Sequence, residues 1–185
     1  MVEPESLKAW QSIPADFDIG LSEDELQLAE GTYGFVFPPD LREILSVAFP
    51  SGSRFPNWRD PSSIDVESQV NAPWHGLVFD IQVASVWPTE WGASPKTLKA
   101  KLDHARTWYE GAPKLIPLFG HRYISESPAV AGNPVLSVHQ TDIIWYGSDI
   151  HDWIEIEFKN KPIDSMTHCP NLSKWSDAMH WRDEV

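Results

Sequence analysis

The sequence predicts an α+β domain with a largely antiparallel sheet. Helical patterns dominate as far as Gly111, whereas short apolar runs typical of strands gather after it, together with one more helix. The alternation of strand and helix that a doubly wound parallel sheet requires is missing. With 185 residues, of which 42% are apolar, the chain can bury a core of its own.

We expect one domain, because no repeat, low-complexity tract or linker divides the chain. Residues 20–160 are predicted to form this α+β domain. Residues 1–19 are an N-terminal lead-in. Residues 161–185 form a polar C-terminal tail that packs on the domain or extends it.

Two short helices are predicted near the N-terminus. Ser22 is a suitable N-cap, and Glu25 completes a capping box three residues later. This helix should end near Gly31 to Gly34. The second begins at Pro38 and Pro39 and ends at Pro50; its apolar residues recur at helical spacing at Leu41, Ile44, Leu45 and Ala48.

The middle of the chain is less regular. Residues 51–63 form a loop by composition, and residues 64–71 fit a helix or a strand equally well. The mixture of apolar and β-branched residues between Trp74 and Val86 favours a strand. Residues 87–92 are a loop, and a helix is predicted from Ser94 and Pro95 to Gly111.

The last part of the chain contains three predicted strands, at residues 114–119, 134–139 and 143–146. The last two are close enough to form an antiparallel hairpin through residues 140–142. Asp149 with its neighbours Gly147 and Ser148 should begin a helix; the apolar face of this helix is formed by Ile150, Trp153, Ile154 and Phe158.

Charge excludes some classes of partner. The chain has 27 acidic and 14 basic residues, a net charge of −13, with the excess at its two ends. Nucleic acid and anionic membranes are therefore not expected as ligands, because both need a basic surface. The same charge attracts a basic protein, although acidic residues also serve simple solubility.

Location and cofactors follow from what the sequence lacks. Cys169 is the only cysteine, no N-terminal signal pattern is present and no apolar run is long enough to span a membrane, so a cytoplasmic protein is expected. We find no phosphate-binding glycine loop and no nucleophile elbow, and we expect no cofactor. The spacing of His168, Cys169 and His180 does not match known metal sites, so no metal is expected.

Two loops combine residue types that are common at protein interfaces. Arg54, Trp58 and Asp60 lie in the first, which suits a contact surface or a loop held by a buried Trp. Trp87 and Trp91 lie in the second. The chain has ten Trp residues, too many for all their N–H groups to find partners inside one core. We predict partner contacts at these five residues.

His121, Arg122 and Tyr123 follow a predicted strand and are the most suggestive polar cluster. Together they can bind a carboxylate or act as acid and base, which leaves a small-ligand enzyme as an alternative. The other interpretation is structural, with His121 and Arg122 pairing with nearby acids and Tyr123 packing inside. We include all three among the predicted contact residues.

Several segments resemble the SUKH superfamily, also described as the Smi/Knr family. The opening is similar at Leu21–Glu30 and at Gly34–Leu41, where an acidic helix ends at Ala-Glu and a Gly and a Pro introduce the second helix. A bacterial branch is similar at Leu115–Tyr123, Gly132–Val135 and Thr141–Gly147. The C-terminal tail and the Trp-rich middle depart from the family pattern.

The resemblance implies an α+β fold and a non-enzymatic protein that binds other proteins. Bacterial members often act as immunity proteins against toxins, many of which are nucleases or deaminases. The expected partner is thus a cognate basic toxin or another basic protein. A regulatory scaffold of a signalling or envelope-associated complex, as in the fungal members, is the alternative.

Overall fold

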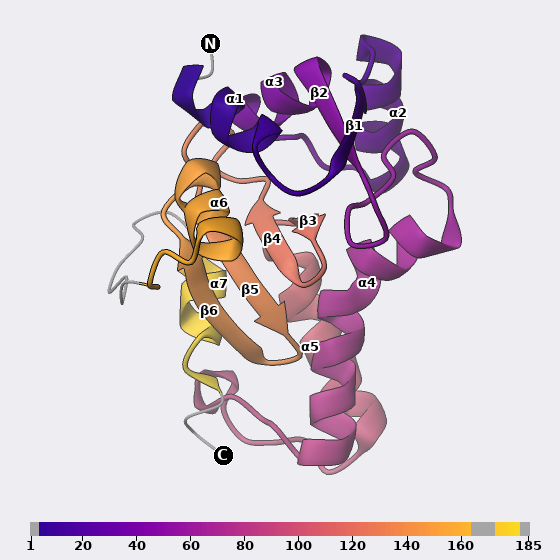
Figure 1. Cartoon of the computed structure of the whole chain (residues 1–185). Helices are drawn as coiled ribbons and strands as arrows, with labels where there is room; N and C mark the ends of the chain where they lie inside the picture. Colours follow the sequence, from indigo (N-terminus) through magenta and orange to yellow (C-terminus); the bar gives the residue numbers. More distant parts are fainter. Residues whose placement is uncertain (1–3, 164–172, 182–185) are drawn as a thin grey trace.

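A four-stranded antiparallel sheet lies at the centre of the computed structural model, which describes residues 4–163 and 173–181 (Figure 1). Each strand pairs with the next along the chain. This confirms the predicted α+β fold with a largely antiparallel sheet. The strands are β3 Leu115–Phe119, β4 Arg122–Ser125, β5 Val135–His139 and β6 Asp142–Gly147.

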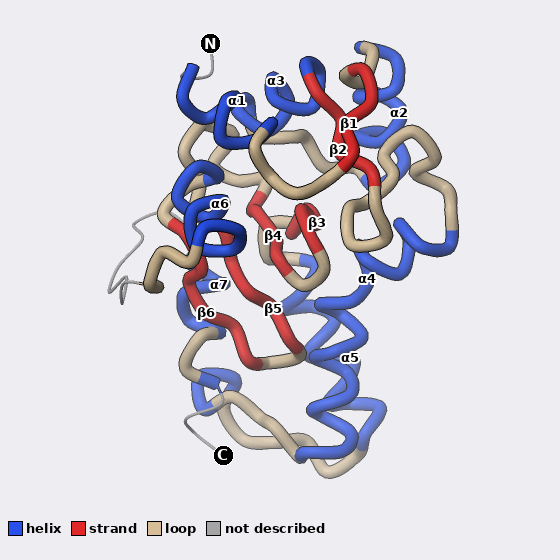
Figure 2. Tube along the Cα trace, viewed as in Figure 1, coloured by secondary structure: helices blue, strands red, loops and turns tan. Residues whose placement is uncertain are grey.

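The central strands are buried on both faces, because each face of the sheet supports its own core. Successive side chains of a strand point to opposite faces. Ile116 and Ile124 therefore join one apolar cluster with the N-terminal helices, while Leu115 and Tyr123 join the other. Figure 2 shows helices on both sides of the sheet. This arrangement explains why the strands appear in the sequence as continuous apolar runs.

The N-terminal part of the chain covers one end of this sheet. It consists of α1 Pro4–Gln11, β1 Asp16–Ile19, α2 Glu23–Tyr33, α3 Pro39–Val47 and β2 Ala48–Ser51. β1 and β2 pair antiparallel as a separate two-stranded ribbon (Figure 1). The expected lead-in at residues 1–19 therefore includes a helix and a strand, which were too short for the pattern to reveal.

Helix α2 begins and ends where its sequence predicts. Ser22 and Glu25 form the complete capping box, and Gly34 ends the helix in the left-handed conformation. Lys114, at the start of β3, donates hydrogen bonds to the carbonyls of Tyr33 and Gly34 at 2.7 and 2.6 Å. A cation is favourable at a helix C-terminus, so this lysine also fixes α2 against the sheet.

The expected strand between Trp74 and Val86 is wrong. Residues Ile64–Phe79 form the long helix α4, which continues into the π-helical turn η1 at Asp80–Ala84. Ser63 caps the helix by accepting a hydrogen bond from the Val66 N–H. Val66, Leu77 and Ile81 recur at helical spacing and are buried. This periodicity decides the structure, whereas composition alone favoured a strand.

A short 3₁₀ turn, η2 Thr89–Trp91, and helix α5 Leu98–Glu110 follow. Helix α5 begins later than Ser94, at the N-cap Thr97, whose hydroxyl accepts a hydrogen bond from the Ala100 N–H at 3.3 Å. The predicted hairpin of residues 134–146 is confirmed as β5 and β6. The helix after it is α6 Ile150–Lys159, capped by Asp149 as predicted.

Helix α7, Ser173–Ala178, lies within the part of the chain that was expected to be a polar tail. Trp175 and Trp181 are 3% and 1% exposed and belong to the same apolar cluster as Tyr123. The described part of this segment thus contributes to the core. His168 and Cys169 lie outside the described residues.

Candidate functional site

The predicted contact residues fall into two groups in the structure. Arg54, Trp58 and Asp60 lie in the loop after β2, close to the turn between β3 and β4 that carries His121. The Gly120 N–H donates to the Arg54 carbonyl at 2.7 Å, which joins loop and turn. Trp87 and Trp91 lie in the connection between η1 and α5. Figure 1 shows this connection at the end of the molecule opposite the β1–β2 ribbon.

Arg122 is bound inside the protein. Its Nε donates to Glu157 at 2.9 Å, and its Nη1 donates to the Ser137 hydroxyl at 2.8 Å. The guanidinium carbon lies 3.5 Å from the ring centre of Tyr146. Arg122 and Glu157 are 8% and 11% exposed, so the pair is largely shielded from water. The guanidinium of Arg122 is therefore engaged by partners inside the protein, which is a structural role.

Tyr123 lies on the opposite face of β4 from Arg122, because adjacent residues of a strand point in opposite directions. Its hydroxyl donates to the Gln69 carbonyl of α4 at 2.8 Å, and its side chain is 1% exposed. Burial raises the pKa of Tyr123. The expectation of a functional loop at residues 121–123 is thus wrong for Arg122 and Tyr123, which are strand residues.

His121 is the accessible member of this trio, and it is half-buried in the β3–β4 turn. Its ring centre lies 6.2 Å from that of His139. Desolvation lowers its pKa, and the charges of Arg122 and His139 lower it further. The side chains of His121, Arg122 and Tyr123 therefore do not converge on one substrate position.

Trp58 is a core residue, which corrects its predicted place on a contact surface. It is 2% exposed and packs edge-on against the rings of Phe35 and Phe37, with ring centres 5.6 and 5.4 Å away. The loop is thus clamped to the domain by Trp58, while its loop neighbours Arg54 and Asp60 are exposed.

Trp87 and Trp91 belong to a cluster of aromatic rings. Their ring centres are 5.1 Å apart, and each lies within 5.2 Å of the His104 ring. Trp91 also contacts Trp181, whose indole N–H donates to the Glu90 carboxylate. The rings of Trp87, Trp91 and His104 pack directly on one another, so no space for a cation remains between them.

A hollow of about 310 Å³ lies beside the β1–β2 ribbon, and we call it the Asp18 hollow. Its volume is at the lower end of the range for ligand sites, roughly 300–1,000 Å³. It is lined by Asp18, Phe49, Pro50, Ser51, Gly52, Phe55, Asn57 and Arg59. Phe49 and Phe55 are 3% and 8% exposed and form an apolar floor, while Asp18, Asn57 and Arg59 supply polar groups.

Arg59 holds the loop, the ribbon and helix α2 together. Its Nη1 donates to Glu25 at 2.5 Å, and its Nη2 donates to the Ile19 carbonyl. The Ser22 N–H also donates to Glu25, and these contacts lower the pKa of that carboxyl. The carboxylate of Glu25 is therefore ionised at neutral pH and balances the charge of Arg59.

Exposed carboxylates lie on β1, at the start of α2 and in the loop of Arg59, the three segments that Arg59 joins beside this hollow, and we call them the acidic surface. Its members form no salt bridge with any residue in the described part of the chain, in contrast to Glu23 and Glu25, which pair with arginines. They are Asp16, Asp18, Asp24 and Asp60. Ile19 stands among them with 81% of its surface exposed. Of these residues, sequence reasoning identified only Asp60.

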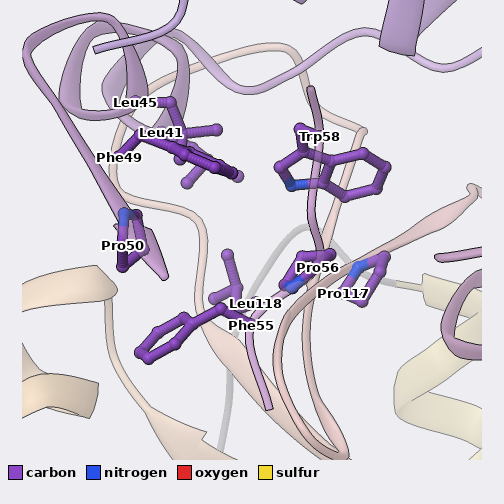
Figure 3. A pocket seen from close by; sticks show the side chains of 9 residues that line it. All are labelled: Leu41, Leu45, Phe49, Pro50, Phe55, Pro56, Trp58, Pro117 and Leu118. Carbon is purple, nitrogen blue, oxygen red and sulfur yellow. The ribbon is translucent and has the colours of Figure 1, made fainter. Parts of the chain in front are cut away.

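The other cavities are less suited to a ligand. Figure 3 shows an apolar slot between Leu41, Phe55, Trp58 and Pro117, which holds only about 10 Å³. That volume corresponds to about one water molecule, and the lining offers no polar group to hold it. A shallow hollow between α1 and α6 is lined by Lys8, His151 and Lys159, and Glu155 pairs with the last two.

Within residues 4–163 and 173–181, no three His, Cys, Asp or Glu side chains come close enough to hold a metal ion. No helix in the same ranges has the length and apolar character needed to cross a bilayer. No protein-family model, curated protein or solved structure matches the chain. The chemistry of the acidic surface is therefore the basis for a functional proposal.

Proposed function

We propose that this chain is a non-enzymatic binding protein of the immunity type, which neutralises a cognate basic toxin by covering it. The observation that carries the proposal is the acidic surface around the Asp18 hollow. Four exposed carboxylates and the exposed Ile19 lie on the segments that Arg59 joins, beside an apolar-floored cavity. A charged rim around an apolar centre is typical of protein interfaces.

The charge of the surface selects the class of partner. With a net charge of −13, the chain attracts basic proteins over long distances and repels nucleic acid. A nuclease carries a basic groove for its substrate, and an acidic protein can occupy that groove. The resemblance to the SUKH superfamily points to the same class of partner.

The alternative of an enzyme based on His121, Arg122 and Tyr123 has less support. Arg122 and Tyr123 point to opposite faces of the sheet, and both are bound to internal partners. A shared substrate would need groups that converge on one position. We therefore propose protein binding, with the acidic surface as the contact region.

Growth rescue tests this proposal. The chain is co-expressed with a basic toxin encoded by the reading frame next to its own gene, and growth is followed after the toxin is induced. We expect rescue by the native chain and co-elution of a complex in size-exclusion chromatography. Growth arrest in the presence of the folded chain, with no complex, would contradict the proposal and favour a regulatory scaffold.

A further inference from the structure

The register between β1 and β2 decides which residues of the ribbon face the Asp18 hollow. Asp16 pairs with Ser51 and Asp18 pairs with Phe49. Paired residues of an antiparallel ribbon, and residues two apart along a strand, share one face. Asp16 and Asp18 thus lie on the same face as Phe49, which lines the hollow.

The hollow offers two kinds of contact at once. Its floor is formed by Phe49 and Phe55, and its polar lining residues are Asp18, Asn57 and Arg59, the last of which is neutralised by Glu25. Aromatic faces attract cations, and a carboxylate binds a guanidinium through charge-assisted hydrogen bonds. Arginine combines a flat cation with a long apolar stem, so it fits both contacts better than lysine does.

An arginine of the chain itself makes such a contact between a guanidinium and an aromatic ring at the edge of the hollow. The guanidinium carbon of Arg59 lies 5.1 Å from the ring centre of Phe49. In the same loop, Arg54 lies 3.9 Å from the ring centre of Phe119. Arg59 is balanced by Glu25 at 2.5 Å. The carboxylates of Asp16 and Asp18 then remain without a salt bridge to any described residue and give the face a negative charge.

We infer that the Asp18 hollow is a recognition pocket for one arginine side chain of the basic partner protein. The inference rests on the proposed function and adds the chemistry of its central contact. The guanidinium lies on the aromatic floor and pairs with Asp18, while Asp16 adds a second negative charge beside it. Because an aromatic floor and a carboxylate both select a cation, neutral side chains of the same shape should bind poorly.

Small probes test the pocket without the toxin. N-acetyl-arginine methylamide, its lysine analogue and its neutral citrulline analogue are titrated into the isotopically labelled chain, and backbone amide shifts are recorded by NMR. We expect saturable shifts at Asp18, Gly52 and Asn57 with arginine, smaller ones with lysine and none with citrulline. Equal shifts with citrulline, or no saturable shift with arginine, would overturn the inference.

Two matched variants separate the pocket from general charge. Asp18→Asn removes the carboxylate of the pocket, and Asp65→Asn removes the same charge from the first turn of α4, outside both the lining and the acidic surface. Both side chains are exposed, so both variants should fold. We expect Asp18→Asn to weaken arginine binding about three- to fivefold and Asp65→Asn to leave it unchanged. Equal weakening of arginine binding by both variants would overturn the inference of an arginine pocket.

The pocket and the proposed function can fail separately. Arginine binding without growth rescue would contradict the immunity role and leave the pocket intact. Growth rescue that is unaffected by Asp18→Asn, in a chain that binds no arginine probe, would contradict the pocket alone. Sedimentation of the chain by itself tests a second copy as occupant: a dimer that Asp18→Asn dissociates would overturn the arginine assignment.

Discussion

The buried carboxylate of Asp80 accepts two hydrogen bonds from Thr141, one from the backbone N–H at 3.0 Å and one from the hydroxyl at 2.5 Å. Asp80 and Thr141 are 4% and 1% exposed. Asp80 belongs to the π-helical turn η1, and Thr141 belongs to the turn between β5 and β6. The pair therefore fastens the end of the long helix to the central hairpin.

Replacing Thr141 with Val should destabilise the protein by about 1.5–3 kcal/mol, because the buried Asp80 carboxylate loses a hydroxyl donor. The measurement is urea unfolding followed by far-UV circular dichroism. Thr107→Val is the control, since its hydroxyl donates to a backbone carbonyl on an exposed part of α5. We expect about 0.5 kcal/mol or less there. Equal losses of unfolding free energy in the two variants would show that the buried Asp80 carboxylate does not need the Thr141 hydroxyl.

Gly76 allows α4 to approach the same hairpin closely. A Cβ added at Gly76 would lie 2.6 Å from the Cα of Gln140, which is too close for real atoms. Gly76→Ala should therefore lower the free energy of unfolding by forcing helix and turn apart. Gly31 is a helical glycine of α2, and a Cβ added there would meet nothing within 4 Å. Gly31→Ala should stabilise the protein by about 0.5–1 kcal/mol.

Thermal unfolding of the two alanine variants side by side checks this pair of predictions. The midpoint should fall for Gly76→Ala and rise for Gly31→Ala. A rise for both variants would mean that the hairpin accommodates a methyl group, and the close approach of α4 to Gln140 would then be wrong.

Breaking the buried Arg122–Glu157 ion pair should strongly destabilise the protein. Glu157→Gln leaves the guanidinium of Arg122 buried without an opposite charge, and we expect a loss of about 3–5 kcal/mol. Glu23→Gln breaks an exposed pair with Arg42, and its effect should be much smaller. Guanidinium chloride unfolding of both variants measures the difference. Similar unfolding midpoints for the two variants would mean that Glu157 is effectively exposed to water.

Folding should be less favourable in mild acid because of His121. Its pKa is lower in the folded protein than in the unfolded chain, so the unfolded chain binds a proton first as pH falls below about 6.5. Stability is thus complete above that pH and decreases as pH falls towards the lower, folded-state pKa. His121→Gln should reduce this pH dependence of the free energy of unfolding. If the free energy of unfolding depends on pH between 7 and 5 equally in His121→Gln and in the native chain, groups other than His121 cause this dependence.

Regular elements with strong local signals could be predicted from the sequence. The capping box of Ser22 and Glu25, the cap at Asp149 and the hairpin of β5 and β6 all depend on neighbours within a few residues. Composition favours a strand at Trp74–Val86 because this segment is rich in apolar and β-branched residues, whereas Val66, Leu77 and Ile81 keep the helical period of α4 and η1. Period is a better guide than composition in such a segment.

The candidate site was harder to predict because long-range pairing creates it. Nothing local shows that Asp18 faces Phe49, since β1 and β2 are short and distant in the sequence. Burial also could not be known for Trp58 and Arg122, which combine interface-type chemistry with interior positions. The charge of the chain did indicate acidic surfaces, but only the fold places Asp16 and Asp18 beside a hollow.

The central proposal is that the acidic surface binds a basic protein, and the affinity for a toxin against which the chain rescues growth tests it most directly. Calorimetric titrations at low and high salt compare the native chain with Asp16→Asn/Asp18→Asn and with a control of equal charge change, Glu110→Gln/Asp177→Asn. We predict that the affinity falls with salt and falls at least about tenfold in the first variant alone. An affinity that is insensitive to salt, or equal in the two variants, would contradict the claim.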